Sequence, residues 1–215
     1  MARTIVVVDY HKGNLSSVER GLVEAGGEAR VSDDASAIRE ASGVVLPGVG
    51  SFGDAMAFLR ESGEAEAVLD AVGRGVPFLG ICLGLQLLFE RGDETDDGSW
   101  AEGLGVMSGS ATRLESTRLK VPHVGWDQLD LTPLGRSCRL FRGVAQGAHV
   151  YFTHSYALAD DVEPCVVAAR THYARSFASA VWRENVYGVQ FHPEKSSAVG
   201  GAILANFVDV VRGGR

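Results

Sequence analysis

Short, uninterrupted runs of apolar residues mark the first half of the chain. They cover residues 5–8, 44–46 and 78–81, and none of them alternates with polar residues. Such runs are typical of strands buried on both faces of a parallel sheet. Between them, apolar residues recur at helical spacing after Asn14 and again after Phe52. The alternation predicts an α/β fold with helices flanking a mostly parallel central sheet.

The second half of the chain has a different pattern. From about Val106, short β-type segments are separated by Pro, Gly, Asn or Asp, and they cover residues 124–131, 148–156, 165–169, 178–182 and 186–191. A last helix is expected over residues 198–211. Because no linker, repeat or low-complexity tract interrupts the chain, we expect residues 1–215 to form a single domain with an additional β-rich part in its second half.

Composition and charge exclude several classes of protein. The chain has 215 residues, of which 46% are apolar and 22% charged, as in an ordinary globular protein. No apolar run approaches the roughly 20 residues that span a bilayer, and no secretory signal is visible, so we expect a cytoplasmic protein without a membrane partner. A net charge of −7 gives no basic surplus for nucleic acid, so we expect no such partner either.

The three cysteines, Cys82, Cys138 and Cys165, are widely spaced and form no C-x-x-C motif. This pattern argues against a disulfide framework and against a zinc ribbon. We therefore expect a reducing compartment, no metal and no cofactor, and one thiol with a chemical role.

Cys82 is the thiol with the most informative surroundings. It lies in Gly80-Ile81-Cys82-Leu83-Gly84, at the junction of a predicted buried strand and a helix. Glycines at both second neighbours are typical of the elbow that presents a nucleophile above a sheet. A helix N-terminus favours a thiolate, and the Leu83 amide can face an oxyanion. Most cysteines are small buried core residues instead, which is the interpretation we favour for Cys138 and Cys165.

A nucleophilic thiol needs a base, and the base needs an orienting group. Residues 190–194 read Gln-Phe-His-Pro-Glu at the end of an apolar strand. Pro193 biases His192 towards an extended conformation, in which residues i and i+2 point to the same side. Glu194 can then hold one imidazole nitrogen while the other faces Cys82. Alone, the segment could equally be a surface turn; with the elbow it indicates a Cys-His-Glu triad.

A third segment, Pro-Gly-Val-Gly-Ser at residues 47–51, directly follows a buried strand. Its two glycines allow the backbone to approach a ligand, so an amide near Val49 or Gly50 can supply a second oxyanion donor. The segment is too short for a phosphate-binding loop and lacks its lysine. An ordinary turn between strand and helix is the alternative.

Two of these motifs resemble the class I, or triad, glutamine amidotransferases: G-I-C-L-G-L-Q at residues 80–86 and Q-F-H-P-E-K-S at residues 190–196. Four others are similar to the glutaminase subunits of imidazole glycerol phosphate synthases. They are D-Y-x-x-G-N-L at 9–15, L-P-G-V-G at 46–50, V-P-H-V-G-W at 121–126 and Y-F-T-H-S-Y at 151–156. The resemblance runs from about Thr4 to Phe207.

The resemblance implies a reaction and assigns residues to it. Cys82 would attack the side-chain amide of L-glutamine, His192 would carry the proton to ammonia, and Glu194 would hold the imidazole. The amides of Leu83 and of the segment around Val49 and Gly50 would form the oxyanion hole. Two further residues would bind the amino-acid end of glutamine, namely Gln86 and Glu94. From local pattern alone, Gln86 could be an exposed helix residue and Glu94 a solvated charge.

The resemblance also implies a partner, a TIM-barrel cyclase subunit that receives the ammonia. By position, five residues would lie towards that interface or the mouth of the active site: His123, Trp126, Tyr151, Ser155 and Lys195. Read locally, several of these could be ordinary strand or core residues. Because the chain has no phosphate-binding motif, it needs such a partner to make a phosphorylated product. We expect the oxyanion hole around Val49 to be mis-set until the partner binds.

The sequence departs from the family pattern at His11, where glycine is more common. If this position requires a positive φ, His11 is strained, and the conformation of the loop with Lys12 is in question. Three alternatives remain open from sequence: a glutaminase that serves another acceptor such as chorismate, a lone cysteine hydrolase, and an inactive regulatory or scaffold subunit.

Overall fold

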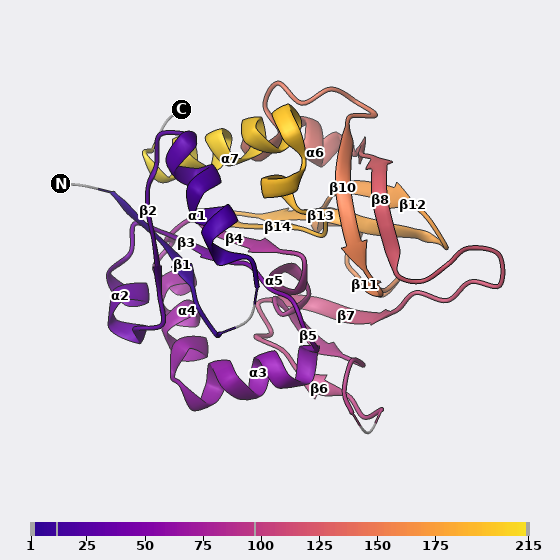
Figure 1. Ribbon diagram of the computed structural model, residues 1–215, viewed down its shortest axis with the longest axis horizontal. Coiled ribbons are helices and arrows are strands. Elements are labelled where there is room, and N and C mark those ends of the chain that lie inside the picture. Colours follow the sequence, from indigo (N-terminus) through magenta and orange to yellow (C-terminus); the bar gives the residue numbers. More distant parts are fainter. Residues whose placement is uncertain (1–2, 12, 97, 214–215) are drawn as a thin grey trace.

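The computed structural model describes residues 3–11, 13–96 and 98–213 (Figure 1). Among them, the largest sheet has eight strands. In spatial order these are β2 (Glu28–Ser32), β1 (Thr4–Val8), β3 (Gly43–Leu46), β4 (Phe78–Ile81), β14 (Val186–Val189), β13 (Ser176–Arg183), β12 (Val167–His172) and β9 (Asp130–Leu131). The pairs from β2 to β14 are parallel, and those from β14 to β9 are antiparallel.

Helices cover both faces of this sheet (Figure 1). On one face lie α1 (Leu15–Glu24) and α7 (Ser197–Val211), and on the other lie α2 (Ala35–Glu40), α3 (Phe52–Glu61) and α4 (Glu64–Gly73). Successive residues of β1 point to opposite sides: Val7 belongs to the cluster with α1 and α7, whereas Val6 belongs to the cluster with α3 and α4. Burial on both faces explains why the strands are uninterrupted apolar runs, and it confirms the predicted α/β class.

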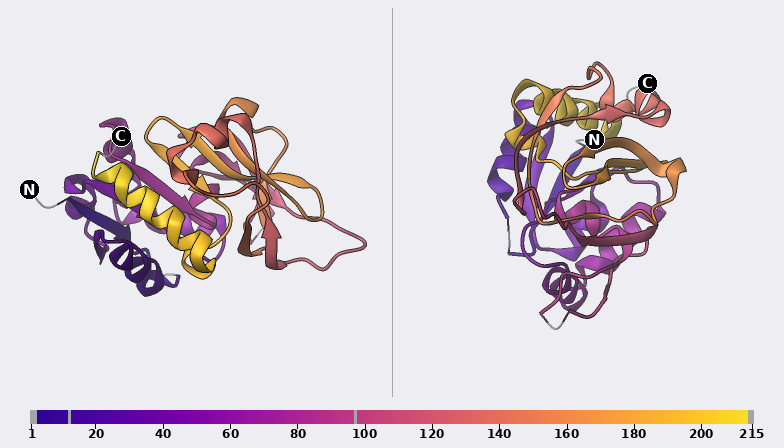
Figure 2. Two further views of the ribbon diagram at one scale, coloured as in Figure 1. Left: turned by 90° about the horizontal axis from the view of Figure 1, so that it is seen from above. Right: turned by 90° about the vertical axis from the view of Figure 1, so that its right-hand side faces the viewer.

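The additional β-rich part consists of two small sheets. One has the order β11 (Tyr156–Leu158), β7 (Met107–Arg113), β5 (Phe89–Gly92) and β6 (Ala101–Glu102). The other pairs β10 (His149–His154) with β8 (His123–Gln128) in antiparallel fashion. The connection between β7 and β8 projects from the end of the molecule far from both termini (Figures 1 and 2).

Five short helical elements complete the described structure. They are the helices α5 (Leu83–Gln86) and α6 (Pro133–Ser137) and the 3₁₀ turns η1 (Arg139–Phe141), η2 (Pro164–Val166) and η3 (Pro193–Lys195). Within the part of the chain that the structure describes, no helix is long and apolar enough to cross a membrane.

Two predicted strands are each divided in the structure. The segment 124–131 breaks at Leu129, because β8 pairs with β10 whereas β9 pairs with β12 of the large sheet. The segment 148–156 breaks at Ser155, where the chain passes from β10 to β11. The segment 165–169 begins as η2 before β12. An apolar pattern reports burial and does not tell which neighbouring strand a residue pairs with, so it cannot reveal these changes of sheet.

Candidate active site

Cys82 occupies the turn between β4 and α5. Its φ of 55° and ψ of −108° are rare for a residue with a side chain. Two glycines close the turn: a Cβ on Gly80 would lie 2.5 Å from the Gly84 carbonyl oxygen, and a Cβ on Gly84 would lie 1.8 Å from the Leu46 carbonyl oxygen. Because no side chain fits at either position, the G-x-C-x-G spacing follows from close packing. The turn has the strand-turn-helix geometry of a nucleophile elbow.

His192 and Glu194 lie just beyond β14 and contact each other. Nδ1 of His192 is 2.8 Å from Oε1 of Glu194, and the two side chains are only 5% and 2% exposed. Ser196 holds this segment against β10, because its hydroxyl donates to the His192 carbonyl oxygen at 2.6 Å and accepts the Tyr151 N–H at 2.9 Å. Glu194 therefore fixes the imidazole, and Ser196 fixes the backbone that carries it.

The surroundings of His192 favour its protonated form. Burial by itself lowers the pKa of the imidazole, but the interactions with Cys82 and with Glu194 outweigh it and raise the pKa to about 10. Nε2 makes no hydrogen bond of normal geometry to a described residue. Its interaction with the Cys82 sulfur is therefore electrostatic. An imidazole arranged in this way can take a proton from a thiol and pass it to a leaving group.

A pocket of about 260 Å³ opens in front of Cys82. It brings together seven of the predicted site residues with four others, and its lining consists of Val49, Gly50, Cys82, Leu83, Gln86, Glu94, Pro122, Thr153, His154, Ser155 and Tyr156. These residues come from both halves of the chain, so the pocket lies between the parallel part of the large sheet and the β-rich part.

The two candidate oxyanion donors differ in whether their N–H groups already donate a hydrogen bond. Leu83 is the first residue of α5, where a backbone N–H has no acceptor within the helix. The Val49 N–H instead donates to the Tyr10 hydroxyl at 3.0 Å, and that hydroxyl lies 3.3 Å from the Val49 carbonyl oxygen. Tyr10 is buried, which raises the pKa of its hydroxyl and keeps it protonated. In this structure the Val49 N–H is thus bound to Tyr10 and is not available to an oxyanion at Cys82.

Gln86 and Glu94 both line the pocket but are held differently. Gln86 is buried, and its Nε2 donates to the Tyr156 carbonyl oxygen at 2.9 Å and to Oε1 of Gln190 at 3.1 Å. Glu94 is partly buried. Burial, followed by repulsion from Asp93 and other carboxylates, raises its pKa to about 7 in spite of a hydrogen bond from the Phe52 amide.

The residues predicted for an interface or channel mouth fall into three groups. Ser155 lines the pocket. Trp126 is 53% exposed on β8 and meets the half-buried Tyr151 edge to face, with ring centroids 6.1 Å apart, and Lys195 is exposed on η3. His123 is only 3% exposed, because its ring stacks between Phe152 and Tyr173. Its side chain therefore reaches neither the pocket nor the surface.

Seven residues of the site were not assigned a role from the sequence: Tyr10, Pro122, Thr153, His154, Tyr156, Gln190 and Ser196. Gln190 and Ser196 lie inside the motif around His192. Gln190 is also a polar residue in an apolar run, a pattern that indicates a buried polar side chain. Burial lowers the pKa of His154 to about 3, so its ring is neutral, and Nδ1 lies 2.8 Å from the Tyr156 carbonyl oxygen. Tyr10 and His154 also lie inside motifs, at residues 9–15 and 151–156, but those motifs do not indicate which groups the two side chains contact.

The first loop gives one further outcome. His11 has a φ of 61°, so this position does require the left-handed region, and His11 is strained as the sequence predicts. Its backbone N–H donates to Asp9 at 2.7 Å, which offsets part of the strain. Lys12 lies outside the described residues.

Comparison with known proteins identifies the family. The family model described as glutamine amidotransferase class-I matches residues 6–211. The chain belongs to the class-I glutamine amidotransferases. Among its curated relatives, an "Imidazole glycerol phosphate synthase subunit HisH" of Syntrophotalea carbinolica is 45% identical over 212 residues, which is 96% of this chain and 100% of the relative. A protein of the same name from Moorella thermoacetica is 46% identical over 210 residues, which is 98% of this chain and 96% of the relative.

Solved structures agree with the amidotransferase fold. PurLQS from Thermotoga maritima superimposes with a TM-score of 0.73 over 99% of each chain, at 19% sequence identity. At that identity the match speaks for the fold alone. The chain is thus a glutamine amidotransferase by family, and its structure holds Cys82 in an elbow that interacts with the buried His192–Glu194 pair.

Proposed function

We propose that the chain is the glutaminase subunit of an imidazole glycerol phosphate synthase. It hydrolyses L-glutamine to glutamate and ammonia, and it passes the ammonia to a TIM-barrel cyclase subunit. One observation carries the proposal: a cysteine held in a strained elbow at a pocket interacts with a buried His192–Glu194 pair. The relatives at 45% and 46% identity are themselves subunits of that synthase, which supports the assignment of the acceptor reaction.

The geometry accounts for each step of the hydrolysis. The Cys82 sulfur attacks the side-chain carbonyl carbon of glutamine, and His192 takes the thiol proton. When the tetrahedral intermediate collapses, the C–N bond breaks and His192 delivers the proton to the leaving ammonia, so a thioester remains on Cys82. Water, deprotonated by His192, then hydrolyses the thioester to glutamate. Glu194 holds the imidazole and stabilises its positive charge throughout.

Oxyanion stabilisation depends on two elements of the pocket. The Leu83 N–H lies next to the nucleophile and supplies one donor. The second donor comes from the segment of Val49 and Gly50, but the Val49 N–H is bound to the Tyr10 hydroxyl. Activation therefore requires this segment to turn, which supports a coupling between partner binding and glutamine hydrolysis. Such a coupling prevents the release of ammonia to water when no acceptor is present.

The exposed face of β8 is the surface we assign to the cyclase. Val124 and Trp126 are both more than half exposed there, in a strand whose partner β10 also leads to Ser155 at the pocket. Large exposed apolar side chains that lie close together are typical of protein interfaces. A cyclase seated on this face would cover the pocket side of the β-rich part, where ammonia is released.

The test is glutamate release from glutamine by the purified chain. We expect low activity alone and strong activation by the cyclase subunit with its nucleotide ligand. Cys82→Ala should abolish release in every mixture. Cys165 is exposed in the structure, so its prediction as a buried core residue is wrong. Cys165→Ala therefore serves as the matched control and should keep the release of glutamate. Release that is absent from all mixtures, or that persists in Cys82→Ala, would contradict the proposal. Activation by the glutamine-dependent synthase of another acceptor instead would reassign the partner.

A further inference from the structure

We propose that Gln190 is a further catalytic residue of this site: its side-chain N–H binds the Cys82 sulfur and favours the thiolate, and Gln86 acts as the positioning residue that fixes its orientation. The inference rests on the proposed function, because it assigns roles within the same reaction. It begins with a contact between two buried groups, since Nε2 of Gln190 lies 3.6 Å from Sγ of Cys82.

The surroundings of Gln190 demand hydrogen bonds for its amide. Gln190 is completely buried, and its neighbours Val189 and Phe191 are buried as well. An amide without hydrogen-bond partners in such a place is strongly destabilising. Both ends of the amide are satisfied here, one by the Cys82 sulfur and the other by Gln86. The polar side chain is thus held just beyond β14, between buried apolar neighbours, by two side chains that line the pocket.

The orientation of both amides follows from one backbone carbonyl. The Tyr156 carbonyl oxygen can only accept a hydrogen bond, so Gln86 must present its NH₂ group to it. The second N–H of the same NH₂ group reaches Gln190, which must therefore present Oε1. Nε2 of Gln190 is then the atom that faces the sulfur. Exchanging the amide oxygen and nitrogen of either glutamine would break this series of hydrogen bonds from the Tyr156 carbonyl to the Cys82 sulfur.

This orientation selects one protonation state of the nucleophile. An NH₂ group donates and does not accept, so it stabilises a thiolate far better than a neutral thiol. His192 is suited to hold the proton, since its pKa is raised by the sulfur and by Glu194. The same geometry adds a role for Gln86. Both of its N–H groups donate within the protein, so it acts on Gln190.

The experiment measures the reactivity of Cys82 without substrate or partner. The full chain carries Cys165→Ala, and the rate at which iodoacetamide modifies the Cys82 peptide is followed from pH 5 to 10 by mass spectrometry. Gln190→Met keeps the side-chain length but removes the donor. We expect its rate at pH 7 to fall about tenfold, as for loss of a hydrogen bond to a charged group, and its rate at pH 10 to approach that of the parent. Gln86→Met should show a smaller change in the same direction.

Two further readouts separate this role from packing. Gln128→Met, at an exposed glutamine on β8, is the matched control and should leave the pH profile unchanged. In the activated glutaminase, Gln190→Met should lower kcat and leave KM for glutamine unchanged. An unchanged pH profile in Gln190→Met, or a change confined to KM, would overturn the inference. If Gln190→Met does not fold, Gln86→Met decides, and an unchanged profile there overturns it.

Modification by iodoacetamide needs neither glutamine nor a cyclase, so the two proposals fail separately. A shifted profile in a chain without glutaminase activity would support the role of Gln190 and contradict the proposed function. Full activity with an unshifted profile would do the reverse.

Discussion

Cys82 adopts a backbone conformation that a residue with a side chain rarely uses, and its neighbours hold it there. The strain of a positive φ costs about 1–3 kcal/mol, which the surrounding packing must offset. Gly80 and Gly84 do so by allowing β4, α5 and the end of β3 to approach more closely than any side chain would permit. At the scale of single residues, the site depends on such close contacts and on the burial of its charged groups.

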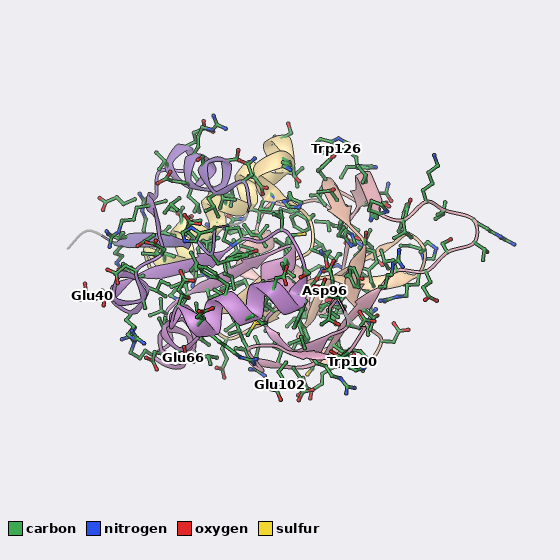
Figure 3. The ribbon with its side chains drawn as sticks, turned by 60° about the horizontal axis from the view of Figure 1, so that its bottom comes forward. Glu40, Glu66, Asp96, Trp100, Glu102 and Trp126 are labelled. Carbon is green, nitrogen blue, oxygen red and sulfur yellow. The ribbon has the colours of Figure 1, made fainter. Side chains whose placement is uncertain are left out.

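The raised pKa of Glu94 leads to the first prediction. If Glu94 binds the ammonium group of glutamine, it does so in its ionised form. With a pKa of about 7, it is mostly ionised at pH 8 and mostly protonated at pH 6. We expect KM for glutamine to rise about tenfold from pH 8 to pH 6 in the activated enzyme. Glu94→Gln should have a high KM that is independent of pH, whereas Glu102→Gln, at an exposed position, should behave like the parent (Figure 3). Equal KM profiles in Glu94→Gln and the parent would remove Glu94 from the binding site.

Tyr10 gives the second prediction at this scale. Its hydroxyl accepts the hydrogen bond of the Val49 N–H, and we assign this N–H to the oxyanion hole. Tyr10→Phe keeps the buried ring and removes only this partner, so the segment of Val49 is released. We expect glutamate release by the isolated chain to rise about tenfold, equivalent to one hydrogen bond, and the activation by cyclase to shrink by a similar factor. A basal rate that falls while activation stays unchanged would show that Tyr10 supports the active arrangement instead.

At the scale of helices and strands, the local sequence pattern predicted some elements and missed others. The uninterrupted apolar runs predicted β1, β3 and β4, and helical spacing predicted α1 and α3, because burial on both faces or along one stripe leaves a direct mark on the sequence. β2 was not predicted. It is an edge strand with half-exposed alternating residues, and its sequence Glu-Ala-Arg-Val-Ser has no apolar run. The division between β8 and β9 depends on long-range pairing, which no local pattern records.

Packing between α7 and η3 leads to the third prediction, which uses two adjacent glycines. A Cβ on Gly200 would lie 1.9 Å from the Pro193 carbonyl oxygen, whereas a Cβ on Gly201 would meet nothing within 4 Å. Gly200→Ala should therefore push η3 away from α7 and displace Glu194. We expect a loss of 1–3 kcal/mol or more in the free energy of unfolding, and a fall of about 100-fold in glutaminase kcat.

Gly201→Ala is the matched control in the same helix turn. It should raise the free energy of unfolding by about 0.5–1 kcal/mol, as expected for Gly to Ala in a helix, with activity unchanged. Chemical denaturation and steady-state kinetics on both variants check the pair. Equal effects of the two substitutions would show that η3 is not held by this contact.

At the scale of the whole molecule, the candidate site lies where two parts of the chain meet. Cys82 comes from the parallel part of the large sheet, whereas Thr153 and His154 come from the end of β10 and Ser155 from its connection to β11. The sequence motifs identified the nucleophile and its base because glycine, histidine and proline carry conformational signals. The contacts of Tyr10 and the directions of the glutamine amides depend on tertiary packing, so they became visible only in the structure.

The partner surface gives the last prediction, since two tryptophans of similar exposure lie on different parts of the molecule (Figure 3). Trp126 is 53% exposed on β8, and Trp100 is 47% exposed beside Arg91, whose guanidinium lies 4.5 Å from its ring. If the cyclase binds the face of β8, Trp126 is a buried anchor in the complex and Trp100 is not. We expect Trp126→Ala to raise the Kd for the cyclase about 30-fold, corresponding to an interface residue worth about 2 kcal/mol, and Trp100→Ala to change it by less than about threefold. Titration calorimetry with each variant measures both values. A larger effect of Trp100→Ala would move the interface to the side of the four-stranded sheet, and the release of ammonia towards β8 would then have to be reconsidered.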